Sequence, residues 1–206
     1  MNFSWIVGMV FSLCLLLSTA AEAAQSVPEN VYQWVQSTAR QNYYFNKQHI
    51  YYLGNADGTM DLNRIEVATL RTYDPVQIKD ILSKRRWKGL SNSRYNDLAA
   101  GADYIEVNLK DHTIAVNEHQ DLDSLWGVIG TNKEPIIINV DVMADNSVER
   151  KFFESIIEYT AKHQAEIIAH TESEKKLTLS AADKKALDKA NNLAEKEEKK
   201  KAGKKK

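Results

Sequence analysis

The chain has 206 residues, with 27 Lys and Arg against 28 Asp and Glu, so its net charge is −1 with neutral histidines. Hydrophobic residues make up 43% of the sequence, which is a globular composition with enough apolar side chains for a real core. The single cysteine, Cys14, excludes a fold that is held together by disulfides.

The N-terminus has the pattern of an export signal. An uncharged apolar run, Trp5–Leu17, is followed by the small residues Ser18–Ala24, and cleavage is expected after Ala23. Residues 1–23 are therefore predicted to be a signal peptide, although no Lys or Arg precedes the run. An uncleaved anchor is the alternative, but the run is shorter than the roughly 20 residues that span a bilayer. The expected protein is secreted across the inner membrane of a bacterium to the periplasm or cell surface, and contacts the membrane only before cleavage.

The remaining chain divides by composition into two parts. Residues 24–170 carry 15 basic and 20 acidic side chains, and are predicted to form a single globular domain. Residues 171–206 lack aromatic residues and carry 12 Lys against 7 acidic residues, a net charge of +5. This part is expected to be a charged extension, helical from Ser180 or disordered, because it offers only a thin apolar face.

Hydrophobic alternation predicts the first group of strands and a helix. Strands are expected at 32–37, 43–45, 50–53 and 64–73, with a hairpin turn at Asn55–Gly58. A helix follows from Asp74 and Pro75, which fit the N-cap and N1 positions, and it ends at Gly89. Its predicted apolar stripe includes Trp87.

The second group of strands is expected at 102–109, 112–118 and 125–129, with an edge strand at 135–138. A long helix then runs from Asn146 or Ser147 to about Ala169, with an apolar stripe wide enough to cover a sheet. The fold class is thus predicted to be α+β. About six to eight short strands form a small antiparallel sheet, a long C-terminal helix covers it, and a short helix lies between the strand groups.

The order of these segments resembles the surface-adhesin E-like domains of small exported bacterial proteins. The resemblance covers roughly residues 31–160 and rests on Gln33-Trp34-Val35, Asn42–Asn46, the strand Ile65–Tyr73, Leu125–Ile129 and the closing helix. It implies a compact sheet with a helix packed on it, in a family of which some members bind host extracellular proteins. Those domains usually have Asp where Asn46 stands, and residues 180–206 lie outside the pattern.

Two basic segments are candidate binding sites. Lys84–Lys88 interleaves cations with an aromatic ring, which suits an anionic partner. Its candidate binding residues are Arg85, Arg86, Trp87 and Lys88, joined by the aromatic residues Tyr43 and Tyr51. The tail lysines are a second, purely electrostatic candidate: Lys199, Lys200, Lys201, Lys204, Lys205 and Lys206. The expected partner is a protein or an anionic envelope polymer, and no specific nucleic acid is indicated.

Enzyme signatures are few. The chain has no P-loop, no dinucleotide-binding glycine pattern and no G-x-S-x-G motif, so no catalytic residue and no cofactor are predicted. The sequence favours a non-enzymatic envelope or surface domain. The alternative is a small metal-dependent extracytoplasmic enzyme, whose weak candidate ligands are His119, Asp121 and Asp123.

Overall fold

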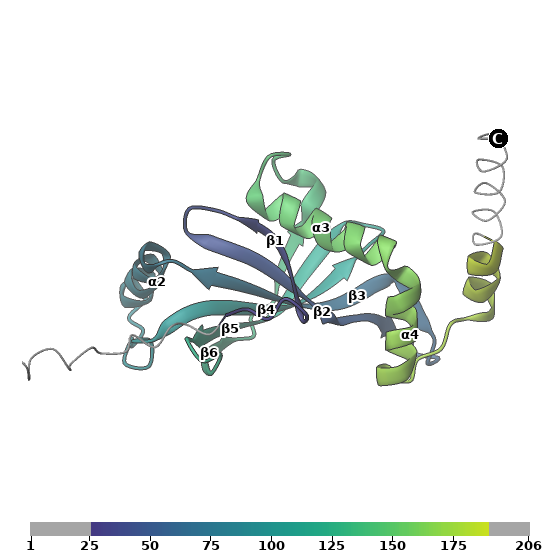
Figure 1. Cartoon of the computed structure of the whole chain (residues 1–206), viewed down its shortest axis with the longest axis horizontal. Coiled ribbons are helices and arrows are strands. Elements are labelled where there is room, and N and C mark those ends of the chain that lie inside the picture. Colours follow the sequence, from purple (N-terminus) through teal and green to yellow (C-terminus); the bar gives the residue numbers. More distant parts are fainter. Residues whose placement is uncertain (1–25, 190–206) are drawn as a thin grey trace, which may run out of the picture.

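The computed structural model describes residues 26–189. In this part of the chain an antiparallel sheet of seven strands carries helices on one face (Figure 1). The elements are β1 (Tyr32–Ser37), β2 (Gln41–Gly54), β3 (Met60–Tyr73), α2 (Pro75–Trp87), β4 (Leu98–Asn108), β5 (Thr113–Asp123), β6 (Val128–Asn132), β7 (Ile136–Asn139), the 3-10 turn η1 (Val140–Val142), α3 (Val148–Lys162) and α4 (Gln164–Lys175). Residues 181–189 are also helical.

The predicted antiparallel sheet is confirmed, and four of its strands are longer than expected. The spatial order is β1-β2-β3-β4-β5-β6, and β7 also pairs with β5 because β6 and β7 use successive parts of that strand. The runs predicted at 43–45 and 50–53 belong to the single strand β2. Its register against β3 shifts between Phe45 and Ile50, and this irregularity interrupts the alternation in the sequence.

One face of the sheet carries the hydrophobic core. Alternate residues of β2 to β5 point toward α3 and α4, and their packing excludes water from the middle of the sheet. The buried members of this core are Tyr43, Phe45, Ile50, Tyr52, Met60, Ile65, Val67, Ile105, Val107, Ile114, Val140, Phe152, Phe153, Ile156, Ile167 and Ile168.

The long C-terminal helix predicted from Ser147 to Ala169 is not confirmed. Ser147 does cap α3, but α3 ends at Lys162 and α4 begins at Gln164, with His163 between them. Strand β1 is short, and it leaves the outer edge of β2 without a strand partner beyond Asn46. Helix α4 covers this edge, and Thr171 Oγ1 accepts a hydrogen bond from the Tyr52 backbone N–H at 3.1 Å.

Helix α2 begins and ends as predicted. Asp74 accepts a hydrogen bond from the Gln77 backbone N–H, and Gly89 follows the helix with a φ of 69°. The apolar stripe expected on this helix is wrong, however, because α2 buries no side chain and Trp87 is 92% exposed. The helix lies over a polar part of the sheet.

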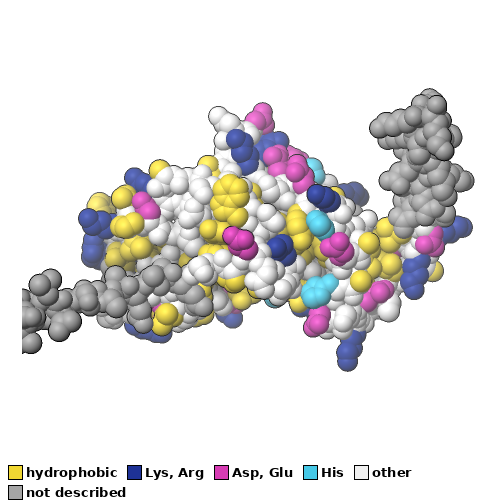
Figure 2. All heavy atoms as spheres, viewed as in Figure 1, with side chains coloured by type: hydrophobic (Ala, Val, Ile, Leu, Met, Phe, Trp, Pro, Cys, Tyr) yellow, Lys and Arg dark blue, Asp and Glu magenta, His cyan; other side chains and the backbone are white. Residues whose placement is uncertain are grey.

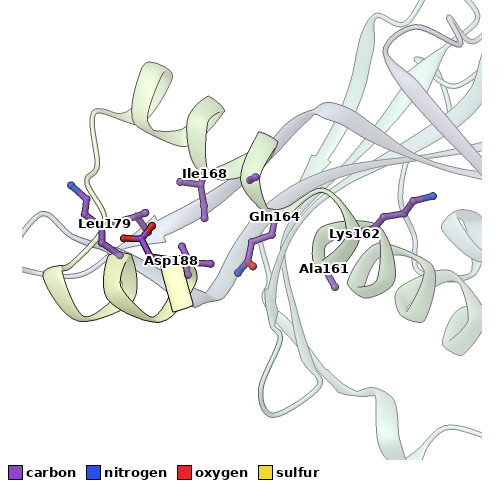
Figure 3. A pocket seen from close by; sticks show the side chains of 9 residues that line it. Ala161, Lys162, Gln164, Ile168, Leu179 and Asp188 are labelled. Atoms are coloured by element: carbon purple, nitrogen blue, oxygen red, sulfur yellow. The ribbon is translucent and has the colours of Figure 1, made fainter. Parts of the chain in front are cut away.

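Backbone hydrogen bonds attach the segment after α4 to the β2–β3 turn. The Met60 backbone N–H donates to the Thr178 carbonyl at 2.9 Å. Ser180 Oγ accepts a hydrogen bond from the Asp183 backbone N–H at 3.1 Å, so it caps the helix that was expected from Ser180. A hollow of about 490 Å³ lies between the α3–α4 junction and the helix at 181–189. Figure 3 shows the side chains that line it. Ala161, Gln164, Ile168, Leu179 and Asp188 are among its lining residues.

Candidate functional site

Charged residues from three adjacent strands meet on the helix-covered face of the sheet. Asp103 of β4 lies opposite His119 of β5, and Arg71 of β3 lies two strands from Asp121 of β5, with Gly101 between them. The same face is apolar one residue pair further along. Burial of an ionic group costs free energy unless the group is paired. Charged side chains on the core face of a sheet are therefore expected to pair with one another.

Every member of this cluster has a partner. Arg71 donates to Asp103 Oδ2, and His119 Nδ1 lies 2.6 Å from Asp103 Oδ1. His119 Nε2 lies 3.2 Å from Asp121 Oδ1, and the Tyr95 hydroxyl donates to Asp121 Oδ2 at 2.9 Å. We call these five residues the charged network.

The two carboxylates keep His119 protonated. The pKa of His119 is raised to about 9. The hydrogen bond to Asp103 has the largest effect, the hydrogen bond to Asp121 has the next largest, and burial opposes both. Burial acts to raise the pKa of Asp103, but the hydrogen bond from His119 and the charge of Arg71 lower it overall. At neutral pH the network therefore holds an imidazolium between two carboxylates.

The raised pKa of His119 predicts a stability that depends on pH. Because the folded pKa exceeds the unfolded value of 6.5, this stabilisation is complete below that value and is lost as the pH rises through about 9. We expect the free energy of unfolding to fall by about 1–2 kcal/mol between about pH 6 and about pH 9.5, because solvent partly screens a side chain that is 32% exposed. Denaturant titrations at several pH values measure this loss.

Substitution of His119 supplies the test of that pH dependence. The His119→Gln variant should show a flatter pH profile over the same interval. The matched control is His112→Gln, because His112 pairs with Asp141 at the surface, where the two side chains are 45% and 60% exposed. An unchanged profile in His119→Gln would show that another group causes the loss.

Two glycines make room for tyrosine hydroxyls beside the network. A Cβ on Gly101 would lie 2.1 Å from the Tyr73 hydroxyl oxygen, and a Cβ on Gly130 would lie 1.9 Å from the Tyr95 hydroxyl oxygen. Burial raises the pKa of Tyr73 to about 12, so this phenol is neutral. The glycines are needed for close approach and not for a special backbone conformation.

The network forms one wall of a hollow of about 460 Å³ beneath α2. Its opposite wall is basic, and comes from the predicted cluster at the end of that helix. The lining residues are Ile81, Lys84, Arg85, Lys88, Leu90, Tyr95, His119, Asp121, Thr131, Asn132 and Glu134. The structure therefore brings together Arg85 and Lys88 of one predicted site with His119 and Asp121 of another.

Arg85 is held in place at the hollow. Its guanidinium carbon lies 3.5 Å from the centre of the Tyr95 ring, and its side chain donates to Asn92 and to the Ser91 carbonyl. In contrast, neither Lys84 nor Lys88 forms an ion pair within residues 26–189. The hollow thus has one fixed cation and two ammonium groups that are open to a ligand.

The other predicted binding residues lie elsewhere. Arg86 and Trp87 project outside the hollow on the same end of α2, where Figure 2 shows basic and hydrophobic side chains together. Tyr43 is buried against Phe152, because it occupies the core face of β2. Tyr51 stacks on His170, with ring centres 4.7 Å apart. The structure does not bring the aromatic residues Tyr43, Tyr51 and Trp87 onto one patch.

The three candidate metal ligands do not converge. Asp123 Oδ1 instead accepts hydrogen bonds from the backbone N–H groups of Leu125 and Gly127, and so stabilises the turn after β5. Both ring nitrogens of His119 are engaged by carboxylates. Within residues 26–189, no group of three or more His, Cys, Asp and Glu side chains is arranged to hold a metal ion.

Sequence reasoning missed the residues that make the network possible. Asp103 and Arg71 stand inside strands that otherwise bury apolar side chains, and Tyr95 lies in the loop before β4. The available signal was a charge at a core-facing position of each strand, since Asp and Arg are rarely buried unless paired. The tail lysines 199–201 and 204–206 lie outside the described residues, as does the predicted signal peptide.

The arrangement suits binding better than proton transfer. His119 carries a proton on each ring nitrogen, and both are directed at carboxylates, so it offers no free nitrogen as a general base near neutral pH. The hollow instead has a hydrogen-bonded polar wall that faces the basic side chains of Lys84, Arg85 and Lys88. In the described part of the chain, no helix is sufficiently long and apolar to cross a membrane.

No family model matches the chain, and no curated protein matches it. Among solved structures, it is similar to protein E of Haemophilus influenzae. The selenomethionine form is 10% identical with a TM-score of 0.43, covering 68% of this chain and 92% of that chain. Crystal form II is 10% identical with a TM-score of 0.44, covering 69% and 96%. Protein E from a non-typeable strain is 9% identical with a TM-score of 0.40, covering 73% and 94%.

These values confirm, as a weak likeness of fold, the resemblance to surface-adhesin E-like domains that was predicted from the sequence. At this identity the likeness transfers no partner and no activity to the chain. The hollow beneath α2, with its basic lining residues, is the feature that bears on function.

Proposed function

We propose that this protein is an exported, non-enzymatic envelope or surface domain that binds an anionic envelope polymer at the hollow beneath α2. The observation that carries this proposal is the presence of Lys84, Arg85 and Lys88 along one wall of a preformed hollow. The opposite wall is fixed by the charged network, so little side-chain entropy is lost there on binding.

The spacing of the cations favours a polymer with repeated charges. Lys84 and Lys88 are one helical turn apart, which places their Cβ atoms about 6 Å from each other. Arg85 lies between them in sequence, with its guanidinium already oriented by Tyr95 and Asn92. Successive phosphate or carboxylate groups of one polymer can therefore meet more than one cation.

Binding to long-chain inorganic polyphosphate tests this proposal. The double variant Lys84→Gln/Lys88→Gln should bind about tenfold more weakly, because two exposed ionic contacts of roughly 0.7 kcal/mol each are lost. The matched control is Lys79→Gln/Lys151→Gln, which removes two exposed charges outside the hollow, one of them from α2 itself. Titration calorimetry at two salt concentrations measures both, since ionic contacts weaken with salt.

Equal losses in the two double variants would contradict a site in the hollow and indicate a diffuse charge effect. A poly-aspartate peptide serves as the second probe. If it binds and polyphosphate does not, the partner is an acidic protein segment and the polymer assignment is overturned.

The compartment is part of the same proposal. The signal peptide at residues 1–23 would bring the domain to the periplasm or cell surface, where such polymers occur. Mass measurement of the N-terminus after expression in a bacterial host tests it. A mature chain that starts at Ala24 in the extracytoplasmic fraction is the expected result, and an intact N-terminus on cytoplasmic protein would contradict export.

A further inference from the structure

Another hollow, of about 500 Å³, lies on the face of the sheet opposite α3 and α4. A small group of buried residues, Leu70, Ala100 and Leu122, forms the apolar layer on this side of the sheet. The lining residues are Ser26, Pro28, Tyr32, Leu70, Ala102, Tyr104, Gln120, Leu122, Trp126 and Val128. We call this hollow the aromatic groove.

Among residues 26–189, no charged side chain lines the aromatic groove, although 27% of the residues in the chain are charged. Its walls are the rings of Tyr32, Tyr104 and Trp126, and its floor includes Leu70 and Leu122. The polar groups in its lining are two phenol hydroxyls, the Ser26 hydroxyl, the Trp126 indole N–H and the Gln120 amide. Charged ligands would lose hydration here without gaining a counter-ion, so the groove suits an uncharged ligand.

Trp126 is held in a backbone conformation that disfavours it. Its φ of 67° lies in the left-handed region, which glycine and asparagine adopt readily and a bulky residue does not. The turn is fixed by Asp123, whose carboxylate accepts from the Leu125 and Gly127 N–H groups and whose carbonyl accepts from the Trp126 N–H at 3.1 Å. Glycine would adopt this conformation without strain, so the turn itself does not require a tryptophan. The indole ring of Trp126 instead lines the groove.

We propose that the aromatic groove binds a neutral glycan that contains N-acetylhexosamine units. Aromatic rings offer flat apolar faces to sugar rings, and hydroxyl and amide groups pair with sugar hydroxyls. The aliphatic floor accommodates the methyl of an acetamido group, whose amide matches that of Gln120. Gln120 Nε2 already donates to Glu118 at 2.7 Å, which leaves its amide oxygen as an acceptor directed by a fixed partner.

Binding of the N-acetylglucosamine tetramer chitotetraose to the purified protein tests this site. Cellotetraose is the matched control, because it has the same linkage and a hydroxyl in place of each acetamido group. We expect saturable binding of chitotetraose, with at least a tenfold preference over cellotetraose, and perturbation of the Trp126 indole N–H resonance. Binding of both tetramers with equal affinity, or of neither at millimolar concentration, would overturn the proposal.

Two variants separate recognition from folding. Trp126→Gly relieves the positive φ but removes the packing of the ring on the layer of Leu70 and Leu122, so its thermal midpoint should fall only slightly while chitotetraose affinity falls about tenfold. Gln120→Ala should abolish the preference for chitotetraose over cellotetraose. Unchanged affinity in Trp126→Gly would overturn the site, as would a dimer in sedimentation experiments that the Trp126→Gly substitution dissociates. Lys84→Gln/Lys88→Gln should bind chitotetraose normally, so failure of the polyphosphate site leaves this result unaffected.

Discussion

Replacement of Asp103 by Asn is expected to lower the free energy of unfolding by about 3–5 kcal/mol, the cost of removing one partner from a buried ion pair. The Asp103 side chain is 7% exposed, and it receives both Arg71 and the imidazolium of His119. An amide oxygen can accept from one of these cations, but the amide NH₂ group then faces the other. The variant therefore leaves a partly buried positive charge without its partner.

Urea denaturation at neutral pH measures this cost, and an exposed Asp supplies the control. Asp80 pairs with Arg40 at the surface, where the side chains are 47% and 51% exposed, so Asp80→Asn should cost less than about 1 kcal/mol. If Asp103→Asn costs no more than Asp80→Asn, the charged network is not an essential part of the folded state.

The Gly101→Ala substitution should also destabilise the protein, by about 1–3 kcal/mol, because its methyl group meets filled space. The new Cβ would lie 2.1 Å from the Tyr73 hydroxyl oxygen and 3.0 Å from His119 Cε1. Neighbouring strands on both sides prevent the backbone of β4 from moving away. The Tyr73 ring has to shift, and the network shifts with it.

Removal of the Tyr73 hydroxyl tests that explanation directly. In the Tyr73→Phe background the same Gly101→Ala substitution should cost much less, with a coupling energy of about 1 kcal/mol or more in a double-mutant cycle. Denaturation of the four proteins supplies the cycle. Strict additivity of the two substitutions would show that the clash with the tyrosine hydroxyl is not the cause.

Local chemistry made some elements predictable. Asp74, Pro75 and Gly89 define the ends of α2 through their own backbone preferences, and the Asn55–Gly58 turn joins β2 to β3 for the same reason. The turn at Trp126 was not predictable in this way, since its apolar residues are typical of a strand. Hydrogen bonds from the backbone to Asp123, and not the propensity of Trp126, produce the turn.

The charged network depends on strand register, which the sequence does not display. Strict alternation from Ile114 would place Glu118 and Gln120 on the core face of β5 and His119 on the open face. The pairing instead shifts between Tyr104 and Ile105, because Asn117 is an extra residue on β5. This bulge directs His119 toward Asp103. Prediction therefore identified His119 and Asp121 as a cluster, but not their partners from β3 and β4.

Backbone amide NMR during a polyphosphate titration shows whether the hollow beneath α2 is a binding site for a polyanion. We predict that the largest chemical-shift changes fall on Lys84, Lys88, Tyr95 and Thr131, which line the hollow from both walls. They should saturate together and should be absent in the Lys84→Gln/Lys88→Gln variant. Shifts that spread over exposed lysines elsewhere, with none on Tyr95 or Thr131, would contradict a binding site in the hollow.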